Sequence, residues 1–404
     1  MTRWSLRHAE EHLLSLELFG MRFGLERMRR LLTALGSPQR RFRAIHVVGT
    51  NGKSSTVRMA AAILEAHGVR TGSYLSPHLT TFAERVRVGD ADTTPEAFAA
   101  AVQRAAAAAA KVERTLEPGE RVTQFELLTA AAFDELARRE VEVAVVEAGL
   151  GGRHDATNTL DAEVAVLTNV GLEHTRWLGP TVEDIAGEKL AVVKPGATLV
   201  VGDVPDALLA GVDAPIVRAD LDEDWGLRGY QRANFAVARA AAEVLHGSLD
   251  GARVREAAAG VVVPGRMQQV ADAPLTLVDG AHNPAGIAAL VRALDDVVGD
   301  RRPVAVVSIL DDKDAAAMLR ALLARCAGAV FCASPNPRAL SPATLASLAG
   351  QLGFADAVIE PDPRAAMERA RALAGPDGAV VATGSIYLVA DLLSARGARR
   401  ASAL

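Results

Sequence analysis

The sequence predicts an α/β protein built from two domains. Its 404 residues exceed what one typical core organises, and short apolar runs alternate with longer segments of helical periodicity. Half of the residues are hydrophobic and only 4% are aromatic, which favours mostly parallel sheets covered by alanine-rich helices. Proline and glycine interrupt the pattern at residues 262–266. We therefore expect one domain at 1–262 and a smaller one at 267–404.

Composition excludes several classes of protein. The net charge of −5 and the pI near 6.0 argue against a nucleic-acid partner, which would require a basic surface. No apolar run reaches membrane-spanning length, and the first residues lack a signal-peptide pattern. We expect a cytoplasmic monomer without a membrane partner. Cys326 and Cys332 flank a strand-like segment and are expected to be buried rather than paired.

The first domain opens with leucines and methionines at helical intervals over residues 6–35, including Leu18 and Met21, which predicts one or two amphipathic helices. Residues 72–79 contain Pro77 between hydroxyl side chains and are predicted to form a loop. Further helices are expected at 57–64, 95–114, 123–139, 181–189 and 230–245, and strands at 45–48, 86–88, 143–146, 164–169 and 197–202.

A glycine-containing loop follows the first of these strands. Residues 49–54 read G-T-N-G-K-S and lead into a helix, an arrangement that points backbone N–H groups and a helix N-terminus at a phosphate. Lys53 would neutralise the transferred charge. The strict G-x-x-x-x-G-K-[ST] pattern fails, because Val47 stands where it requires glycine. The short motif predicts a phosphate site, with a chance turn as the alternative.

Polar residues follow the next buried strands. Glu147 ends the strand at 143–146 and precedes a glycine-rich loop, where open parallel sheets bind ligands. His174 lies just past the strand at 164–169, which makes it a candidate metal ligand, with a structural histidine as the alternative. Arginine supplies most of the positive charge and leaves five lysines, among them Lys53 and Lys189. A lysine kept in such a chain points to a need for a compact amine.

The second domain alternates short strands and helices, which predicts a Rossmann-like domain with a largely parallel sheet. Polar clusters again fall at strand ends, and Asp314 and Ser385 are expected to cap helices. The strands are expected at 275–278, 304–309, 329–332, 357–359 and 379–382.

The combined motifs resemble the folylpolyglutamate synthase and dihydrofolate synthase family, within the Mur ligase superfamily of ATP-dependent amide-forming ligases. The resemblance covers nearly the whole chain, from the first helices to Tyr387. Its motifs are G-T-N-G-K-S, S-P-H-L with E-R, E-A-G-L-G-G-R-H-D-A-T-N, T-N-V-G-L-E-H-T, E-K at 188–189, P-G-R, D-G-A-H-N-P, D-K-D and T-G-S-I-Y-L.

The resemblance implies a reaction in which the γ-phosphoryl of ATP activates a substrate carboxylate as an acyl phosphate, and the amine of L-glutamate then displaces phosphate. The carboxylate would belong to a folate or to dihydropteroate. Such phosphoryl transfer depends on positioning and charge neutralisation rather than on a protein nucleophile. Because the implied site draws on both domains, we also expect ligand-dependent closure.

The family's site residues carry over onto matching positions of this sequence. Lys53, His174 and Lys189 would act in catalysis, and two Mg²⁺ sites are implied, one at Ser76 and Glu147 and one near His174 and Lys189. The matching lysine of the superfamily is carbamylated, so the same is expected of Lys189. ATP would contact Gly49, Thr50, Asn51, Gly52, Lys53, Ser54, Ser55, Asn234, Arg266 and Asp279. The other substrates would contact Pro77, His78, Thr123, Phe125, Asp155, Ala156, His282 and Ser385.

Two departures and two alternatives stay open at this point. Tyr230 stands where many relatives have histidine, which leaves contacts with the nucleotide base undetermined, and Ser54 replaces a common glycine or threonine. A Mur-type ligase for a peptidoglycan nucleotide precursor is the neighbouring enzyme hypothesis, although the S-P-H-L and D-A-T-N loops favour folate. A P-loop switch is the alternative from another class, but it has no use for the polar clusters of the second domain.

Overall fold

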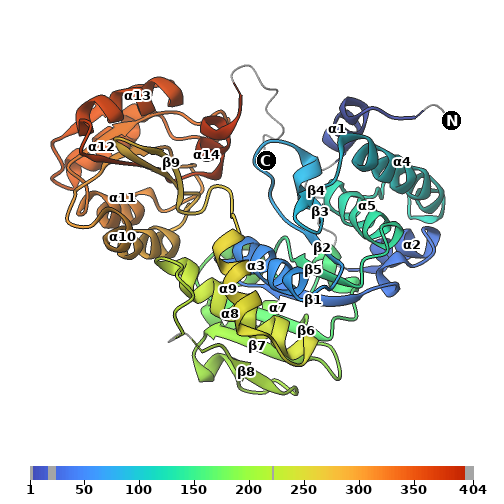
Figure 1. Ribbon diagram of the computed structural model, residues 1–404. Helices are drawn as coiled ribbons and strands as arrows, with labels where there is room; N and C mark the ends of the chain where they lie inside the picture. Colours follow the sequence, from blue (N-terminus) through green and yellow to red (C-terminus); the bar gives the residue numbers. More distant parts are fainter. Residues whose placement is uncertain (1–2, 17–23, 221–222, 396–404) are drawn as a thin grey trace. The chain divides into compact units, whose positions relative to one another are not determined.

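The computed structural model describes residues 3–16, 24–220 and 223–395 of the chain. The chain divides into two compact units, each with its own sheet (Figure 1). The N-terminal unit comprises Met1–Leu227 and Arg232–Val262, and the C-terminal unit comprises Arg228–Gln231 and Val263–Leu404. This division differs from a single cut at residue 262, because the short segment Arg228–Gln231 packs with the C-terminal unit.

The sheet of the N-terminal unit has the strand order β4-β3-β2-β5-β1-β6-β7-β8. Strands β2, β5, β1, β6, β7 and β8 are neighbours in this order and pair in parallel. Strands β3 and β4 add an antiparallel edge next to β2. Their bounds are β1 Arg43–Val48, β2 Thr71–Tyr74, β3 Val86–Val88, β4 Ala91–Asp92, β5 Val143–Glu147, β6 Val164–Asn169, β7 Thr198–Asp203 and β8 Ile216–Arg218.

Nine α-helices and five short 3-10 helices are described in residues 3–262. Helix α3 packs with β1, β2 and β5, and α5 packs with β2 and β3. The α-helices are α1 Leu6–Ser15, α2 Glu26–Ala34, α3 Lys53–Ala66, α4 Pro95–Val112, α5 Gln124–Arg138, α6 Thr175–Leu178, α7 Val182–Leu190, α8 Tyr230–His246 and α9 Gly251–Gly260. The 3-10 helices are η1 Pro38–Arg40, η2 Phe82–Arg85, η3 Glu113–Thr115, η4 Ala156–Thr159 and η5 Asp206–Leu209.

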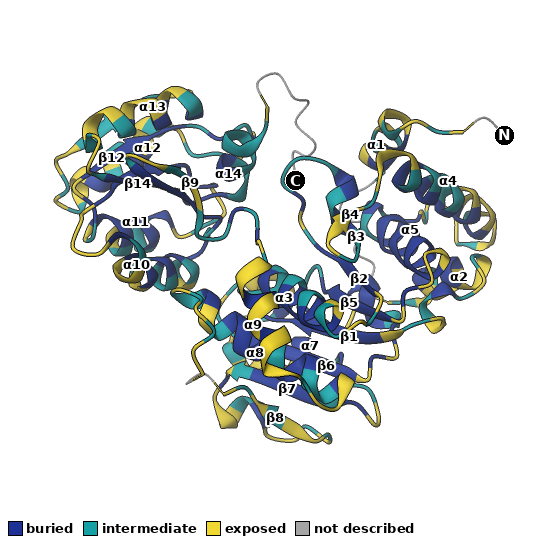
Figure 2. Cartoon of the chain, in the orientation of Figure 1, coloured by how far each residue is buried: buried dark blue, intermediate teal, exposed yellow. Residues whose placement is uncertain are grey.

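The central strands are buried on both faces, as Figure 2 shows by their dark colour. This explains why β1, β5 and β6 read as continuous apolar runs instead of alternating patterns. The buried part of β1 is apolar except at His46, which is fully buried. A strand that could have been wholly aliphatic therefore carries one polar side chain directly before the glycine-containing loop.

The prediction of a loop over residues 72–79 was wrong in its first half. Thr71–Tyr74 forms β2, which lies between β5 and the antiparallel strand β3. The short T-G-S-Y stretch has little strand character of its own, so its conformation is decided by pairing with β5 and β3. Leu18 and Met21, predicted within the first helices, lie outside the described residues.

The sheet of the C-terminal unit has the order β13-β12-β11-β14-β10-β9. Its strands are parallel except β9, an antiparallel edge strand that the sequence did not predict. The bounds are β9 Gln268–Asp272, β10 Leu275–Val278, β11 Val304–Val307, β12 Gly328–Phe331, β13 Ala357–Ile359 and β14 Ala379–Thr383, with helices α10 Pro284–Val298, α11 Ala315–Leu323, α12 Pro342–Gln351, α13 Pro363–Ala374 and α14 Ile386–Leu393.

Local expectations for this unit are confirmed at several positions. Asp314 caps α11 and Ser385 caps α14, each accepting a backbone N–H from the first turn of the helix. Cys326 and Cys332 are both free thiols and both buried. Among the described residues, no helix combines the length and apolar character needed to span a membrane.

Candidate active site

The glycine-containing loop connects β1 to α3. Gly52 immediately precedes α3 with a φ of 84°, a conformation that favours glycine. A Cβ at Gly52 would lie 2.4 Å from Oδ1 of Asn234, and one at Gly49 would lie 1.9 Å from Oγ1 of Thr168. The loop is thus closely packed, and it brings Asn234 of α8, predicted to contact ATP, against its backbone.

The end of β6 holds this loop in place. The Asn51 N–H donates to Oδ1 of Asn169 at 3.0 Å, and the Thr168 hydroxyl donates to the Asn51 carbonyl at 2.6 Å. The Thr50 N–H donates to the Asn169 carbonyl at 3.1 Å. The loop is therefore fixed by its own protein contacts, which suits a preformed anion site at the start of α3.

Two lysines meet at one atom of the loop. The carbonyl oxygen of Gly49 accepts from Lys53 Nζ at 3.0 Å and from Lys189 Nζ at 2.9 Å. Lys189 lies in the last turn of α7 and is only 3% exposed. Its burial, followed by the positive charge of Lys53, lowers the pKa of Lys189 to about 7. A neutral amine is therefore well populated near neutral pH.

Glu147 accepts hydrogen bonds from two other segments of the chain, those that contain Ser54 and Ser76. It is buried at the end of β5, in register with Val47 of β1. Its Oε1 accepts the Ser54 hydroxyl at 3.0 Å, and its Oε2 accepts the Ser76 backbone N–H at 3.1 Å. The structure thus places the predicted metal residues Glu147 and Ser76 together, beside the start of α3.

His174 occupies a different environment. It precedes α6 with a φ of 50°, and its Nε2 lies 3.4 Å from Oε1 of Glu173. The His174 side chain is 38% exposed, whereas that of Glu173 is 9% exposed. The negative charge of Glu173 also acts on the pKa of Lys189 and opposes its depression. Sequence reasoning did not single out Glu173, although it lies in the same motif as His174.

The donor chemistry fits a hard divalent cation. In the part of the chain that the structure describes, no three His, Cys, Asp or Glu side chains converge. Glu147 nevertheless provides carboxylate oxygens beside the Ser54 hydroxyl and the Ser76 backbone, and Glu173 provides one beside His174. Mg²⁺ and Mn²⁺ favour such oxygen ligands, and Mg²⁺ is commonly held by one or two carboxylates together with substrate phosphates.

An aromatic ring and a carboxylate lie on either side of the glycine-rich loop after β5. A Cβ at Gly149 would lie 2.5 Å from the Phe125 ring, so this position has no room for a side chain. The next residue, Leu150, donates its N–H to Oδ2 of Asp155 at 2.8 Å. The predicted substrate residues Phe125 and Asp155 are therefore brought together by two adjacent loop residues.

Asp155 continues into a buried chain of hydrogen bonds. It caps η4, and its Oδ1 accepts both the backbone N–H and the hydroxyl of Thr157. The Thr157 hydroxyl oxygen in turn lies 2.8 Å from Nε2 of His46. Ala156, also predicted to contact substrate, is the first residue of η4. Sequence reasoning did not connect His46 with Asp155, because His46 lies 111 positions before Thr157.

Two other predicted substrate segments have clear structural partners. The Thr123 hydroxyl takes part in a capping box with Glu126 at the start of α5. After Pro77, Nδ1 of His78 accepts from Arg85 Nε at 2.9 Å. Glu84 accepts the N–H groups of the three residues that follow His78. The loop is thus stabilised by the E-R pair that follows it in the sequence.

A second polar cluster lies within the C-terminal unit. Asp279 is buried, and its Oδ2 accepts the Tyr230 hydroxyl and the Met267 N–H, while its Oδ1 accepts the Ala281 N–H at 2.9 Å. Burial and the charge of Asp279 raise the pKa of Tyr230 well above its usual value, so its hydroxyl stays protonated. A Cβ at Gly280 would lie 2.2 Å from Nη1 of Arg266, which places Arg266 beside Asp279.

The remaining predicted residues of this unit lie on adjoining loops. Nδ1 of His282 lies 2.9 Å from the Gly280 carbonyl oxygen. The Gly384 N–H donates to the Ala281 carbonyl at 3.0 Å, which joins the loop after β10 to the loop after β14. Ser385 is therefore close in the fold to His282, and its hydroxyl accepts the Tyr387 N–H.

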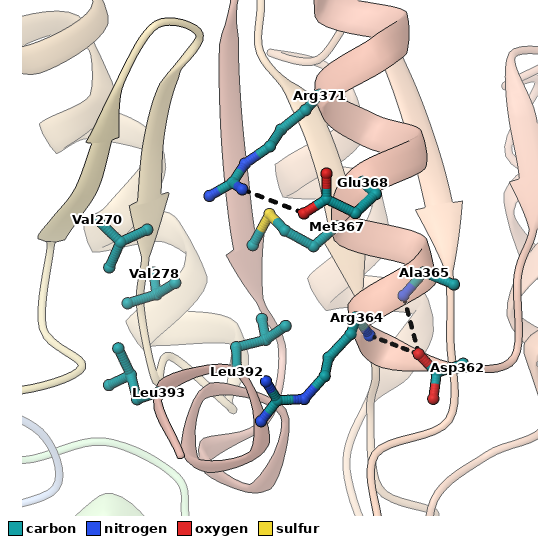
Figure 3. A pocket seen from close by; sticks show the side chains of 10 residues that line it. All are labelled: Val270, Val278, Asp362, Arg364, Ala365, Met367, Glu368, Arg371, Leu392 and Leu393. Carbon is teal, nitrogen blue, oxygen red and sulfur yellow. Dashed lines mark hydrogen bonds and ion pairs between the residues drawn. The ribbon is translucent and has the colours of Figure 1, made fainter. Parts of the chain in front are cut away.

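A cavity of about 730 Å³ in the C-terminal unit contains none of the predicted site residues (Figure 3). Its charged residues already have partners, since Arg371 pairs with Glu368, and Arg364 bonds to the end of α14. Asp362 is likewise used to cap α13. The named charged residues of the cavity are thus engaged in contacts with the protein itself.

The fold and the loop define the class of protein. A model of the glutamate ligase domain of Mur ligases matches residues 265–386, and together with the relatives described next this makes the chain an ATP-dependent ligase. The chain belongs to the folylpolyglutamate synthase and dihydrofolate synthase family. It is 35% identical, over 81% of its length and 77% of the relative's, to a dihydrofolate synthase/folylpolyglutamate synthase of Mycobacterium tuberculosis.

Solved structures show the same similarity over almost the whole chain. The folylpolyglutamate synthase of Mycobacterium tuberculosis complexed with ADP has a TM-score of 0.88 and 32% identity, covering 96% of this chain and 97% of that one. A bifunctional folylpolyglutamate synthase/dihydrofolate synthase with Mn, AMPPNP and L-glutamate bound has a TM-score of 0.85 and 30% identity, with coverage of 96% and 97%. These likenesses confirm the α/β fold class expected from the sequence.

Proposed function

We propose that the protein joins L-glutamate to the carboxylate of a folate, and also to dihydropteroate, at the expense of ATP. The observation that carries this proposal is the convergence of Lys53 and Lys189 on Gly49, at the start of a helix. The Lys53 amine, the backbone N–H groups of the loop and a helix N-terminus suit a polyphosphate. The relatives' names and the nucleotides and L-glutamate in their structures support the same assignment.

The proposed reaction has two steps. The acceptor carboxylate attacks the γ-phosphorus of ATP, which breaks the bond to the β-phosphate oxygen and releases ADP. The glutamate amine then attacks the acyl carbon, and an amide forms as phosphate leaves and the amine loses a proton. Lys53 would stabilise the charge that develops on the transferred phosphoryl group, as positioned cations do in such reactions.

The acceptor would bind beside the loop after β5. A pterin is flat and carries N–H donors along one edge, so it requires an aromatic or glycine surface and a carboxylate acceptor. The Phe125 ring against Gly149, with Asp155 bonded to the next residue, offers these groups. Pro77, His78, Thr123 and Ala156 would border the same region, and His282 and Ser385 would act on the glutamate.

Mg²⁺ would be held by Glu147 and Ser76, and a second ion by His174 and Lys189. When bound, the ions would supply positive charge to the phosphates. The structure supports the first set most directly, since Glu147 already contacts the Ser76 backbone and the Ser54 hydroxyl. Asn234, Arg266 and Asp279 would contact ATP.

Lys189 would serve as a carbamate. A neutral amine adds to CO₂ to give a carbamate anion and one proton, and arginine cannot do this. Lys189 is buried beside a second lysine, which favours its neutral form. The carbamate would replace a buried positive charge with a negative one that can bind a cation near Glu173.

An ADP-release assay with L-glutamate and each acceptor separately tests the proposal, followed by mass measurement of the products. We expect ADP release to depend on both L-glutamate and a tetrahydrofolate or dihydropteroate, with a product heavier by one glutamyl residue. A peptidoglycan nucleotide precursor should not replace the acceptor. ATP hydrolysis unchanged by glutamate and by every acceptor would contradict ligation and favour a nucleotide switch.

A further inference from the structure

The hydrogen-bond chain His46–Thr157–Asp155 determines where each proton lies. The Thr157 hydroxyl has one hydrogen, and it is donated to Oδ1 of Asp155. The contact at 2.8 Å between His46 Nε2 and the Thr157 oxygen therefore requires Nε2 to carry a hydrogen and donate it. His46 is neutral, because burial and the nearby Lys194 lower its pKa to about 3. The imidazole is thus the Nε2–H tautomer.

Burial is unfavourable for the other ring nitrogen of His46. Nδ1 of His46 is buried without a hydrogen-bond partner, and an unpaired buried polar atom lowers stability. Its neighbours in β1 are apolar, and an aliphatic side chain would suit a strand buried on both faces. Unfavourable features of this kind are expected where a residue serves a site.

We propose that His46 is a positioning residue for the acceptor substrate, acting through Thr157 on the Asp155 carboxylate. By donating to Thr157, His46 occupies a lone pair of the hydroxyl oxygen and leaves the hydroxyl hydrogen to point at Asp155. Asp155, whose Oδ2 also accepts the Leu150 N–H, is then held in one orientation for its proposed contact with the N–H edge of a flat heteroaromatic ring. This inference rests on the proposed folate activity, and all three residues belong to the N-terminal unit.

Two pairs of variants test the inference. His46→Leu removes the donor, while His46→Gln keeps an N–H near the position of Nε2. Thr157→Val removes the hydroxyl at nearly constant shape, while Thr157→Ser keeps it. The readouts are kcat and the KM values for tetrahydrofolate, ATP and L-glutamate, together with tetrahydrofolate and ADP binding by calorimetry.

We expect His46→Leu and Thr157→Val to raise the KM and the Kd for tetrahydrofolate about tenfold, which corresponds to about 1.4 kcal/mol. The KM values for ATP and L-glutamate, and ADP binding, should change by less than about twofold. His46→Gln and Thr157→Ser should restore most of the acceptor affinity. If His46→Leu does not fold, the Thr157→Val and Thr157→Ser pair decides the question.

Two results would overturn the inference. One is unchanged tetrahydrofolate binding in His46→Leu and Thr157→Val, in an assay in which the control variant Asp155→Asn binds tetrahydrofolate more weakly. The other is an equal rise in the KM values of all three substrates, which indicates a purely structural role. Failure of the proposed function would differ from both, because wild-type protein itself would neither bind tetrahydrofolate nor release ADP in its presence.

Discussion

Lys53 and Lys189 donate to the same carbonyl oxygen, that of Gly49, although they lie on different helices. Burial disfavours the charged form of Lys189, and repulsion by Lys53 at the same acceptor adds to the effect, so the pKa of Lys189 falls to about 7. The same carbonyl therefore holds Lys53 beside a second lysine, Lys189, that can react as a neutral amine.

Replacing Lys189 tests its proposed carbamylation. Lys189→Ala should lower kcat by about 10²-fold or more, in the range measured when a preorganised stabilising group is removed. A small added carboxylate such as acetate should restore part of the activity by occupying the position of the carbamate. Steady-state ADP release measures both effects.

Lys189→Arg is the matched control, since it keeps the positive charge but cannot form a carbamate. We expect it to be as impaired as Lys189→Ala and not to respond to acetate. Wild-type activity in Lys189→Arg would refute carbamylation.

Alanine substitutions at two glycines distinguish the cost of backbone strain from the cost of a steric clash in the glycine-containing loop. Gly52 and Gly68 have nearly equal φ angles of 84° and 82°, but a Cβ meets Asn234 only at Gly52 and nothing within 4 Å at Gly68. Gly68→Ala should therefore reduce the free energy of unfolding by about 1–2 kcal/mol and leave kcat/KM unchanged. Gly52→Ala should carry the same strain and also raise the KM for ATP at least tenfold.

Urea unfolding and ATP-dependent kinetics of the two variants provide the comparison. Equal effects of Gly52→Ala and Gly68→Ala on the KM for ATP would show that the contact between Gly52 and Asn234 has no part in nucleotide binding.

Tyr230→Phe tests the hydrogen bond to Asp279. The change removes one of three donors from a buried carboxylate, and hydrogen bonds to charged groups contribute about 1.5–3 kcal/mol. The loss should appear as faster amide hydrogen exchange around Asp279 and as a higher KM for ATP.

Tyr74→Phe is the control, because the Tyr74 hydroxyl bonds to a neutral group, the Thr129 hydroxyl, at 3.1 Å in the N-terminal unit. Tyr74→Phe should lower the free energy of unfolding by about 0.5–1.5 kcal/mol. Amide hydrogen exchange around Asp279 should not change. If Tyr74→Phe lowered the free energy of unfolding as much as Tyr230→Phe, a special role for the contact between Tyr230 and Asp279 would be contradicted.

His46 also predicts a pH dependence of stability. The pKa of His46 is about 3 in the folded protein and 6.5 in the unfolded chain, so below pH 6.5 the unfolded chain binds a proton that the folded chain does not. The contribution of neutral His46 to the free energy of unfolding is fully present above pH 6.5 and is lost as the pH falls from 6.5 towards 3. The groups that act on His46 are Lys194 and, through Thr157, Asp155.

Between pH 7 and pH 5 the free energy of unfolding should fall by about 2 kcal/mol more in the wild type than in His46→Gln, because each pKa unit corresponds to about 1.36 kcal/mol. Urea unfolding at the two pH values measures the difference. Parallel losses in both proteins would show that His46 is not buried in its neutral form.

Sequence reasoning located most elements and the loops at strand ends, because buried parallel strands are apolar runs and polar clusters follow them. It placed Lys53, Glu147 and Asp155 as candidates, and their roles stay predictions. It did not predict β2, β9 or the partnership of Asp279 with Tyr230. Strand pairing and contacts between distant segments fix these features, and they leave no local pattern.

The sequence by itself determined the α/β class and the family, since these follow from the order of strands, helices and motifs along the chain. Only the tertiary structure decided that Asn234 packs on Gly52, that Lys189 shares a carbonyl with Lys53, and that His46 reaches Asp155 through Thr157. Each of these contacts joins segments that are brought together by the sheet. Hydrogen-bond geometry and burial, which set the proton positions and the pKa of Lys189, exist only after that assembly.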